Sequence, residues 1–256
     1  MAEVNREYVG SLDLSDLAQL CNLQGFDDLP YPFTQTGRPG LKEASADLQV
    51  FRTWVNSYAH ADIWVDSRVM YRPNDIPDTR VLAFRADQLG FCASQRSDED
   101  VIDVYQLSPY ELGAAVANLM TLTGPGRHPR ISIPKYMGYF RRATAALNND
   151  DDDDYEFSVL DAVPRNTASA ATNVPNAHVA AMGTVQSHCE PAHSWGVDWD
   201  KNLVAWVQVR DDGDYIYEPD FSHAMPMTEQ KLVNRIDQLI AEDVAHLRSQ
   251  RRNHLS

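Results

Sequence analysis

The chain contains the segment Leu89-Gly-Phe-Cys-Ala-Ser-Gln-Arg96, which is followed by the acidic turn Asp98-Glu99-Asp100 and a further extended segment. A similar series appears later as Leu203-Val-Ala-Trp-Val-Gln-Val-Arg210, followed by Asp211-Asp212-Gly213-Asp214. Apolar residues that recur in short runs predict strands, and an acidic turn with glycine predicts a hairpin. Laid over each other, the two series predict that the second half of the chain repeats the plan of the first.

The same order of elements surrounds the two segments. From Ala61 to Leu122 the pattern predicts four strands and then a helix, and from Met182 to Glu242 it predicts that order again. Two similar halves imply one domain with a sheet-based body and a pseudo-twofold axis, its pseudo-repeats spanning about residues 12–126 and 127–247. The expected strands are residues 62–71, 81–85, 91–96 and 101–107 in the first half, and 184–189, 194–199, 203–210 and 215–219 in the second.

Helices are expected around these strands. Ser108-Pro109-Tyr110-Glu111 predicts a helix start, because serine can cap a helix, proline suits its first position and glutamate can reach back to the cap. The other expected helices run from Asp13 or Ser15 to Asn22, over residues 41–58, 135–147 and 156–162, and from Thr228 onward. The run Asp150 to Asp154 predicts a solvated loop, since it lacks the spacing and turn glycine of a calcium-binding loop.

Composition limits the classes of partner. The chain has 256 residues and a formal net charge of −15. Such an excess of acid argues against nucleic acid and against an anionic membrane surface, because both are bound through clustered lysine and arginine. No run approaches the roughly 20 apolar residues of a membrane span, and the first residues do not form a signal peptide. We therefore expect a cytoplasmic protein.

The densest cluster of reactive side chains is His188-Cys189-Glu190-Pro191-Ala192-His193. A cysteine beside histidines can form a nucleophile with a base, or part of a metal site. In a strand, however, His188 and Cys189 point to opposite faces and do not converge. No nucleotide-binding, zinc-protease or nucleophile-elbow motif is present. We therefore expect no catalytic residue, no metal and no cofactor.

Two motifs are the most specific in the chain: Leu29-Pro-Tyr-Pro32, after a leucine-rich helix and a glycine, and Gly183-Thr-Val-Gln186. With the order of strands and helices around them, the chain resembles the EspG family of ESX (type VII) secretion-associated proteins. The resemblance extends from about Leu12 to Val244. Family members often begin with a strand before the first helix, of which Val4 to Val9 is the remnant here. They also carry a Gly-Arg-Tyr-like step where this chain has Asn202-Leu-Val-Ala-Trp206.

The resemblance implies an α/β (α+β) fold with a quasi-twofold, mainly antiparallel central sheet flanked by helical bundles. It also implies a cytosolic chaperone that binds the apolar tip of a PPE protein in a PE–PPE heterodimer and keeps the heterodimer soluble for export. We expect contacts from the loop between the early strands, at Asn74, Asp75 and Ile76. A second set is expected on the outer face of the last helix, at Arg235, Gln238 and Glu242. The free protein is expected to be a monomer or a weak dimer.

Two other functions are compatible with the sequence. One is a small hydrolase that uses Cys189 with His188 or His193. The other is a structural module that dimerises through the edge of its sheet. Loss of function on Cys189→Ala, with the fold intact, would favour the hydrolase. Light scattering with and without a partner would separate the chaperone from the dimerising module.

Overall fold

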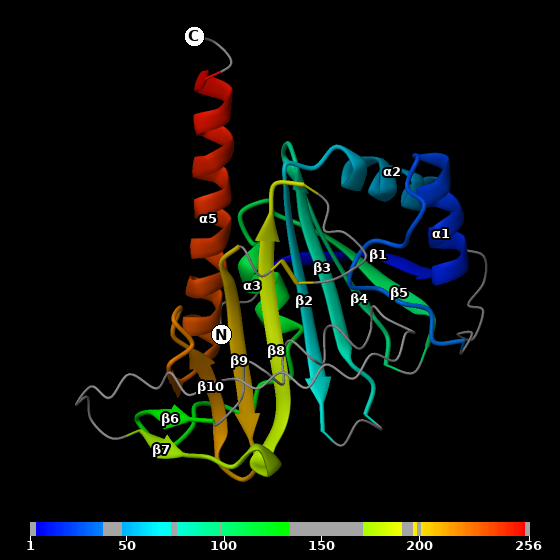
Figure 1. Ribbon diagram of the computed structural model, residues 1–256. Helices are drawn as coiled ribbons and strands as arrows, with labels where there is room; N and C mark the ends of the chain where they lie inside the picture. Colours follow the sequence, from blue (N-terminus) through cyan, green and yellow to red (C-terminus); the bar gives the residue numbers. More distant parts are fainter. Residues whose placement is uncertain are drawn as a thin grey trace, which may run out of the picture.

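The computed structural model contains one large β-sheet with helices on both of its faces (Figure 1). The structure describes residues 4–37, 48–72, 76–97, 99–133, 171–190, 197–198 and 201–253. Over these residues the sheet has 11 strands in the order β1-β5-β4-β3-β2-β8-β9-β10-β11-β6-β7. Every pair of neighbours is antiparallel except β6 and β7. The expected α+β class with a mainly antiparallel central sheet is confirmed.

The elements follow one another in two series. The first is β1 (Arg6–Asp13), α1 (Leu14–Leu23), α2 (Leu48–Ala59), β2 (Ile63–Tyr71), β3 (Thr79–Ala86), β4 (Leu89–Gln95), β5 (Val101–Leu107) and α3 (Leu112–Asn118). The second is β6 (Ile131–Ser132), β7 (Thr172–Asn173), the short 3-10 helix η1 (Asn176–His178), β8 (Val179–His188), β9 (Leu203–Val209), β10 (Gly213–Tyr217), β11 (Ala224–Pro226) and α5 (Glu229–Asn253).

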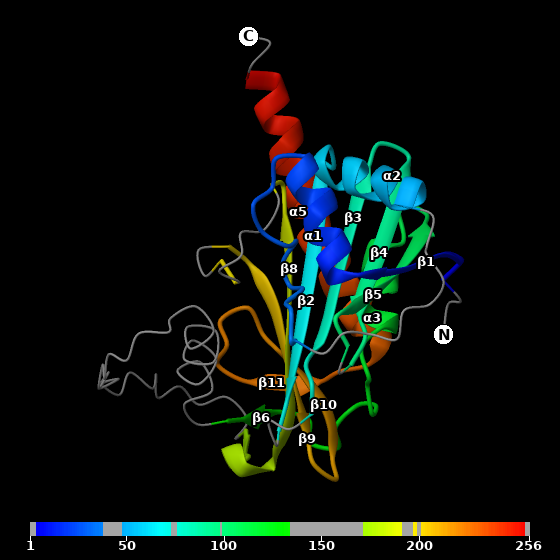
Figure 2. The ribbon, with the colours of Figure 1, turned by 90° about the vertical axis from the view of Figure 1, so that its right-hand side faces the viewer.

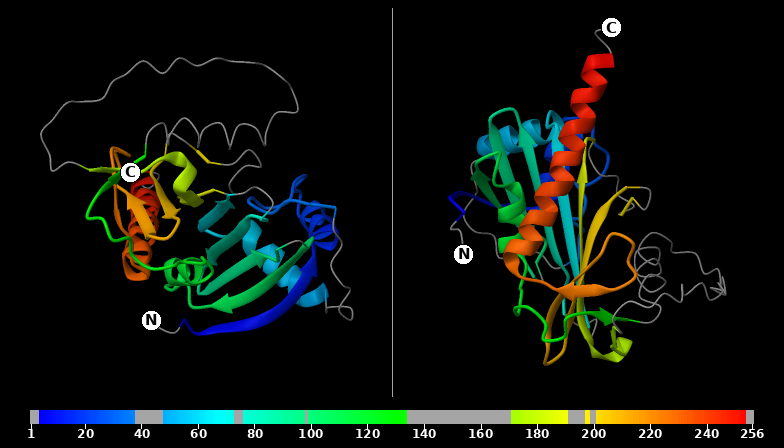
Figure 3. Two further views of the ribbon diagram at one scale, coloured as in Figure 1. Left: turned by 90° about the horizontal axis from the view of Figure 1, so that it is seen from below. Right: turned by 90° about the vertical axis from the view of Figure 1, so that its left-hand side faces the viewer.

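The centre of the sheet is the antiparallel pair β2 and β8, in which Ser67 lies opposite Val185. From this pair β3, β4 and β5 step outward on one side, and β9, β10 and β11 step outward on the other. A helix then follows each series, α3 in the first and α5 in the second. The view from below shows the two series on either side of the β2–β8 pair (Figure 3). The pseudo-repeat boundaries at about residues 12–126 and 127–247 stay a prediction.

The structure corrects the way in which the two series correspond. The sequence overlay matched residues 89–96 with residues 203–210, which are β4 and β9. Counted from the centre, β4 is the third strand of its series but β9 is the second of its own. The position that corresponds to β9 is therefore that of β3. The overlay failed because an apolar strand, an arginine and an acidic turn also occur in unrelated hairpins.

The strands of the second half were also partly misplaced. A strand was expected over residues 194–199, but Val197 and Asp198, the described residues of this range, lie outside any strand. The fourth strand of this half is instead β11, which the sequence did not predict. Because β11 has only three residues and contains Pro226, it shows no alternation to detect.

The two faces of the sheet carry different helices. In β2, Ile63, Val65 and Val69 pack with residues of α3 and α5, whereas Trp64 packs on the other face with residues of α1 and α2. Alternate side chains of a strand point to opposite faces, so the sheet lies between these helix pairs. Figure 2 shows α1 and α2 in front of the strands that α3 and α5 cover from behind. In the second half, the face away from α5 is lined by another apolar cluster.

The start of the chain is more regular than the sequence indicated. Val4 to Val9 was taken as the remnant of a first strand, but β1 has eight residues and pairs with β5 along its length, with one irregularity after Tyr8. Asp13 then ends β1 and caps α1, because its carboxylate accepts a hydrogen bond of 2.8 Å from Ser15 N. The bounds of α1 and its buried stripe are as predicted.

Helix α3 begins one turn later than predicted. Its N-cap is Glu111, without a side-chain hydrogen bond, and Ser108 instead accepts a hydrogen bond from Glu111 N at its backbone oxygen. The reason is the close approach of this segment to β4. A Cβ on Gly90 would lie 2.8 Å from Ser108 O and 3.0 Å from Pro109 Cα. The chain therefore makes a turn packed against Gly90 before the helix starts.

Helix α5 is the longest element, and its C-terminal end extends beyond the end of the sheet (Figures 1 and 2). Its first four turns are anchored by the buried residues Leu232, Ile236, Leu239 and Asp243. Among the residues that the structure describes, no helix has the length and apolar character needed to cross a membrane.

Candidate functional site

One of the two most specific sequence motifs, Gly183-Thr-Val-Gln186, lies at the centre of the sheet. Gly183 is on β8 opposite Val69 of β2 and Trp206 of β9. A Cβ at this position would overlap the indole ring of Trp206, which is fully buried. The glycine is thus required for the close packing of that ring under α5.

Gln186 in the same motif holds the segment that precedes β9. Its Nε2 donates to Asp198 O at 2.6 Å, and its Oε1 accepts from Asp198 N at 2.9 Å. In the first half, Gln95 does the same for Thr34, with distances of 2.8 and 3.2 Å. Both glutamine side chains therefore act like a neighbouring strand and fix a connecting segment. These hydrogen bonds within the protein account for both glutamines.

The loop between β2 and β3 is the first candidate contact, and its base is fixed by charges. Asp78 Oδ2 lies 2.5 Å from Arg68 Nη2 and 3.1 Å from Arg80 Nη2, and all three side chains are largely buried. Above this base Ile76 is 47% exposed. Asn74 and Asp75 lie outside the described residues. The predicted apolar member of the loop is therefore accessible, on a base that ion pairs hold in place.

The Leu29-Pro-Tyr-Pro32 motif approaches the same base. Burial raises the pKa of Tyr31, and the carboxylate of Asp66 raises it further, while Arg68 and Arg80 oppose the rise. Tyr31 thus lies within electrostatic reach of the charges that hold the loop. Phe33 N donates to Pro30 O at 3.0 Å, so the motif forms a turn.

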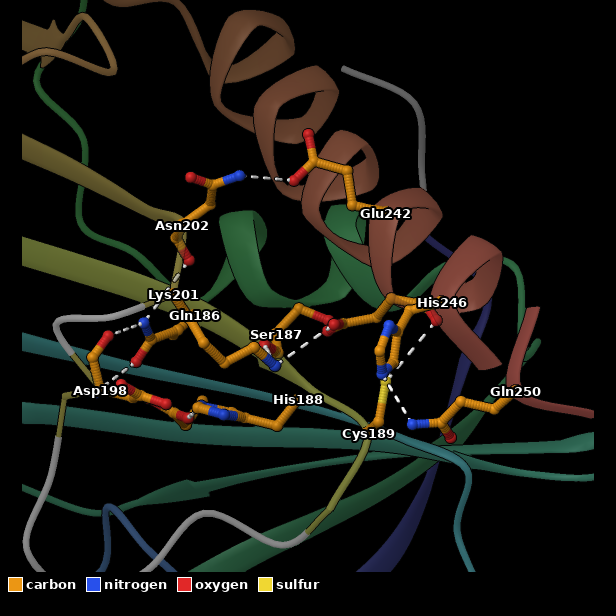
Figure 4. A network of polar contacts seen from close by, with 12 residues as sticks. Gln186, Ser187, His188, Cys189, Asp198, Lys201, Asn202, Glu242, His246 and Gln250 are labelled. Carbon is orange, nitrogen blue, oxygen red and sulfur yellow. Dashed lines mark hydrogen bonds and ion pairs between the residues drawn. The ribbon is translucent and has the colours of Figure 1, made fainter. Parts of the chain in front are cut away.

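The outer face of α5 is the second candidate contact, and part of it is used within the molecule (Figure 4). Gln238 and Glu242 are exposed, and Arg235 is half-buried. Gln238 Nε2 donates to Glu242 Oε1 at 3.2 Å, and Asn202 Nδ2 donates to Glu242 Oε2 at 2.9 Å. Glu242 therefore ties α5 to the residue before β9.

An ion pair lies beside this hydrogen bond. Lys201 Nζ lies 3.2 Å from Asp243 Oδ1 and donates to Ser187 O at 3.0 Å. Figure 4 shows this network between the end of β8 and α5. It joins the helix to the central strand, and a partner at this face would meet a surface that is already ordered.

The structure does not bring the two candidate contacts together. The β2–β3 loop follows Tyr71, which pairs with Ala181 near the start of β8. Glu242 contacts Asn202, next to Leu203, which pairs with Gln186 near the end of β8. The five residue steps from Ala181 to Gln186 span roughly 17 Å of strand. The two candidate contacts therefore lie at opposite ends of β8.

His188 and Cys189 of the reactive cluster contact different elements, β2 and α5. His188 Nε2 lies 2.7 Å from Asp66 Oδ2 of β2, and both side chains are buried. Cys189 Sγ lies on the side of α5, 3.6 Å from Asp243 O. Burial and the nearby Asp243 raise the pKa of the Cys189 thiol to about 11, which disfavours the thiolate at neutral pH. His193 lies outside the described residues.

No metal site accompanies this cluster in the described part of the chain, because no three His, Cys, Asp or Glu side chains there group closely enough to hold an ion. Sequence reasoning missed several exposed apolar side chains. Besides Ile76 they are Tyr8, Leu23, Leu89 and Tyr110. Tyr110 belongs to the segment interpreted as a helix cap, and Leu89 is the first residue of β4, next to the glycine that packs against that segment, so their exposure could not be inferred from periodicity.

A comparison with solved structures finds proteins of similar structure. The structure is similar to that of the Mycobacterium tuberculosis type VII secretion system chaperone EspG5, which was solved in complex with a PE25–PPE41 dimer. The alignment covers 92% of this chain and 96% of that chain, with 13% identity and a TM-score of 0.45. No protein-family model and no curated protein matches the sequence. A likeness at this level assigns no residue of this chain to a function.

Proposed function

We propose that this protein is a cytoplasmic secretion chaperone without catalytic activity. It binds the apolar tip of a PPE protein in a PE–PPE heterodimer and keeps the heterodimer soluble for type VII (ESX) export. The sequence supports this function through its resemblance to the EspG family, carried most specifically by Leu29-Pro-Tyr-Pro32 and Gly183-Thr-Val-Gln186. Release of the client requires no bond to break, because a competing surface at the secretion machinery is sufficient.

The observation that carries the proposal is the exposed side chain of Ile76. An apolar side chain that is 47% exposed above a fixed base has the form of an interface anchor. The ion pairs of Asp78 with Arg68 and Arg80 limit the freedom that the loop would lose on binding. Asn74 and Asp75 are proposed as its polar neighbours in the contact. Covering the apolar tip of a client at such an anchor would remove a surface that otherwise aggregates.

The first experiment is co-expression with each candidate PE–PPE pair encoded in the same genome, followed by pulldown and gel filtration. A stable complex with one copy of each chain would support the function. If none of the encoded pairs co-purified, the function would be rejected, and the resemblance would describe the fold alone.

Affinity measurements with Ile76→Arg then test the loop. The guanidinium would replace an apolar contact, and we expect Kd to rise by at least roughly tenfold, or about 1.4 kcal/mol. Leu89→Arg is the matched control, because Leu89 is also an exposed apolar residue but lies at the opposite end of β3. Equal affinities for the wild type and Ile76→Arg would remove the loop from the interface.

The outer face of α5 is proposed as a separate contact through Arg235, Gln238 and Glu242. Alanine at Arg235 and Gln238 leaves the Asn202–Glu242 hydrogen bond intact and therefore tests binding with little effect on the fold. A threefold or greater loss of affinity, on the order of 0.7 kcal/mol, would support this contact. An unchanged Kd would restrict the interface to other surfaces.

A further inference from the structure

The end of α5 differs from the rest of the helix in what surrounds it. The last buried residue of the helix is Asp243. After it, Val244 and Leu247 are half-buried, while Ala245, His246 and Arg248 are exposed. Figure 3 shows this end of the helix standing clear of the strands. Residues 244–253, called the α5 extension below, form about 15 Å of helix. Val244 and Leu247 in its first part still pack against the apolar core, whereas the part after Leu247 has no apolar residue.

The α5 extension also has the opposite charge to the body. It contains Arg248, Arg251 and Arg252 and no aspartate or glutamate. The whole chain has a formal charge of −15, so the remainder carries −18. All three arginines are exposed. A cationic projection on an acidic protein is therefore a local feature that the average composition hides.

Helix stability does not explain this arrangement fully. Cations near a helix C-terminus are favourable, but the effect is confined to about the last turn. Arg248 lies five residues before the helix ends at Asn253 and is outside that range. After Leu247 the helix has no apolar residue to pack, and a helical stretch without packing is only marginally stable in water. The exposed Arg248 is therefore explained neither by the helix dipole nor by packing.

We propose that the α5 extension is a docking site for an acidic segment of a protein partner. Arginine forms bidentate hydrogen bonds with carboxylates, and Arg248 and Arg251 follow each other at the spacing that places both on one side of a helix. A nucleic acid would need a wider cationic surface and would be repelled by the remaining charge of −18. A membrane surface would need a broad apolar face, whereas Val244 and Leu247 already pack against the apolar core of the protein.

The test uses a fluorescent deca-glutamate peptide as the probe and measures anisotropy against the full-length protein in 50 mM salt. Arg248→Glu combined with Arg251→Glu is the test variant. Arg6→Glu combined with Arg52→Glu is the matched control, since both are exposed arginines on other elements and the net charge changes equally. We expect affinity to fall by roughly tenfold or more in the test variant and by less than about twofold in the control. Circular dichroism confirms that the helix persists.

The outcomes separate the alternatives. Equal losses in the two variants would mean that net charge alone decides binding, and would overturn the proposal. So would an absence of binding by the wild type. Tighter binding of duplex DNA or phosphatidylserine vesicles than of the peptide would assign the extension to a different class of partner. Because this test contains no PE–PPE pair, its result is independent of the proposed chaperone function.

Discussion

Substitution of Gly183 by alanine tests the packing at the centre of the sheet. The added Cβ would lie 2.7 Å from Trp206 Cζ2 and closer to two other atoms of the ring, well inside the 3.5–4.0 Å of a favourable carbon contact. Trp206 is fully buried, so its ring has nowhere to move freely. Overpacking of this kind costs about 1–3 kcal/mol, and contacts this short place the cost near 3 kcal/mol. Alanine returns roughly 0.5–1 kcal/mol of the entropy that glycine loses in a strand. The net destabilisation is therefore about 2 kcal/mol.

Urea unfolding followed by fluorescence measures this change, and thermal unfolding should show a decrease in Tm of about 4–8 °C. A double-mutant cycle with Trp206→Leu isolates the cause. In the Trp206→Leu background the extra methyl group has room, so Gly183→Ala should become neutral or slightly stabilising. The coupling energy between the two sites is then about 2 kcal/mol. A Gly183→Ala protein within about 0.5 kcal/mol of the wild type, or a coupling near zero, would refute the reasoning.

Other predictions concern carboxylates and a thiol. Asp214 is fully buried and accepts hydrogen bonds from Gly124 N and three other donors, so Asp214→Ala should lower the free energy of unfolding in urea by roughly 3 kcal/mol or more; a loss below about 1 kcal/mol would contradict this. Burial alone would raise the pKa of Asp212, but hydrogen bonds, including one from Tyr215 Oη at 2.6 Å, hold it below its ordinary value of 3.8. The wild type should therefore have a higher free energy of unfolding than Asp212→Asn above pH 4, and this difference should shrink as the pH falls further. A difference that does not change with pH would contradict the prediction. With a pKa of about 11, Cys189 should be alkylated at pH 7.5 more than roughly 100-fold more slowly than free cysteine, and rapid labelling in peptide mass spectra would revive the hydrolase hypothesis.

The first half of the fold could be predicted because its signals are local. In β2, alternating apolar residues mark a strand with two faces, and Asp13 marks the start of α1 by a side chain that caps it. The second half was harder, because β8, β9 and β10 are buried on both faces and show little alternation. Without alternation, only composition and turn residues can indicate where a strand lies. The overlay based on them paired β9 with β4, although its position in the sheet corresponds to that of β3.

The candidate site depended on contacts that a sequence does not contain. The ion pairs of Asp78, at the base of the loop that contains the exposed Ile76, join it to Arg68 of β2 and to Arg80 of β3. That Glu242 already has a partner follows from the approach of Asn202 to α5 across 40 positions of sequence. Residue type predicted which side chains could meet a partner, but only the sheet register showed that the loop and the helix face lie at different ends of β8.

The position of β8 beside β2 has a consequence for the newly made chain. Just over 100 residues separate the end of β2 from the start of β8, and ribosomes add about 5–20 residues per second. For roughly 5–20 s β2 therefore presents an open edge, while the first five strands, β1 to β5, can pair with one another. Such an edge can pair with the edge of a neighbouring chain. A protein proposed to shield the apolar surface of others must itself pass through an interval in which its own central strand is unprotected.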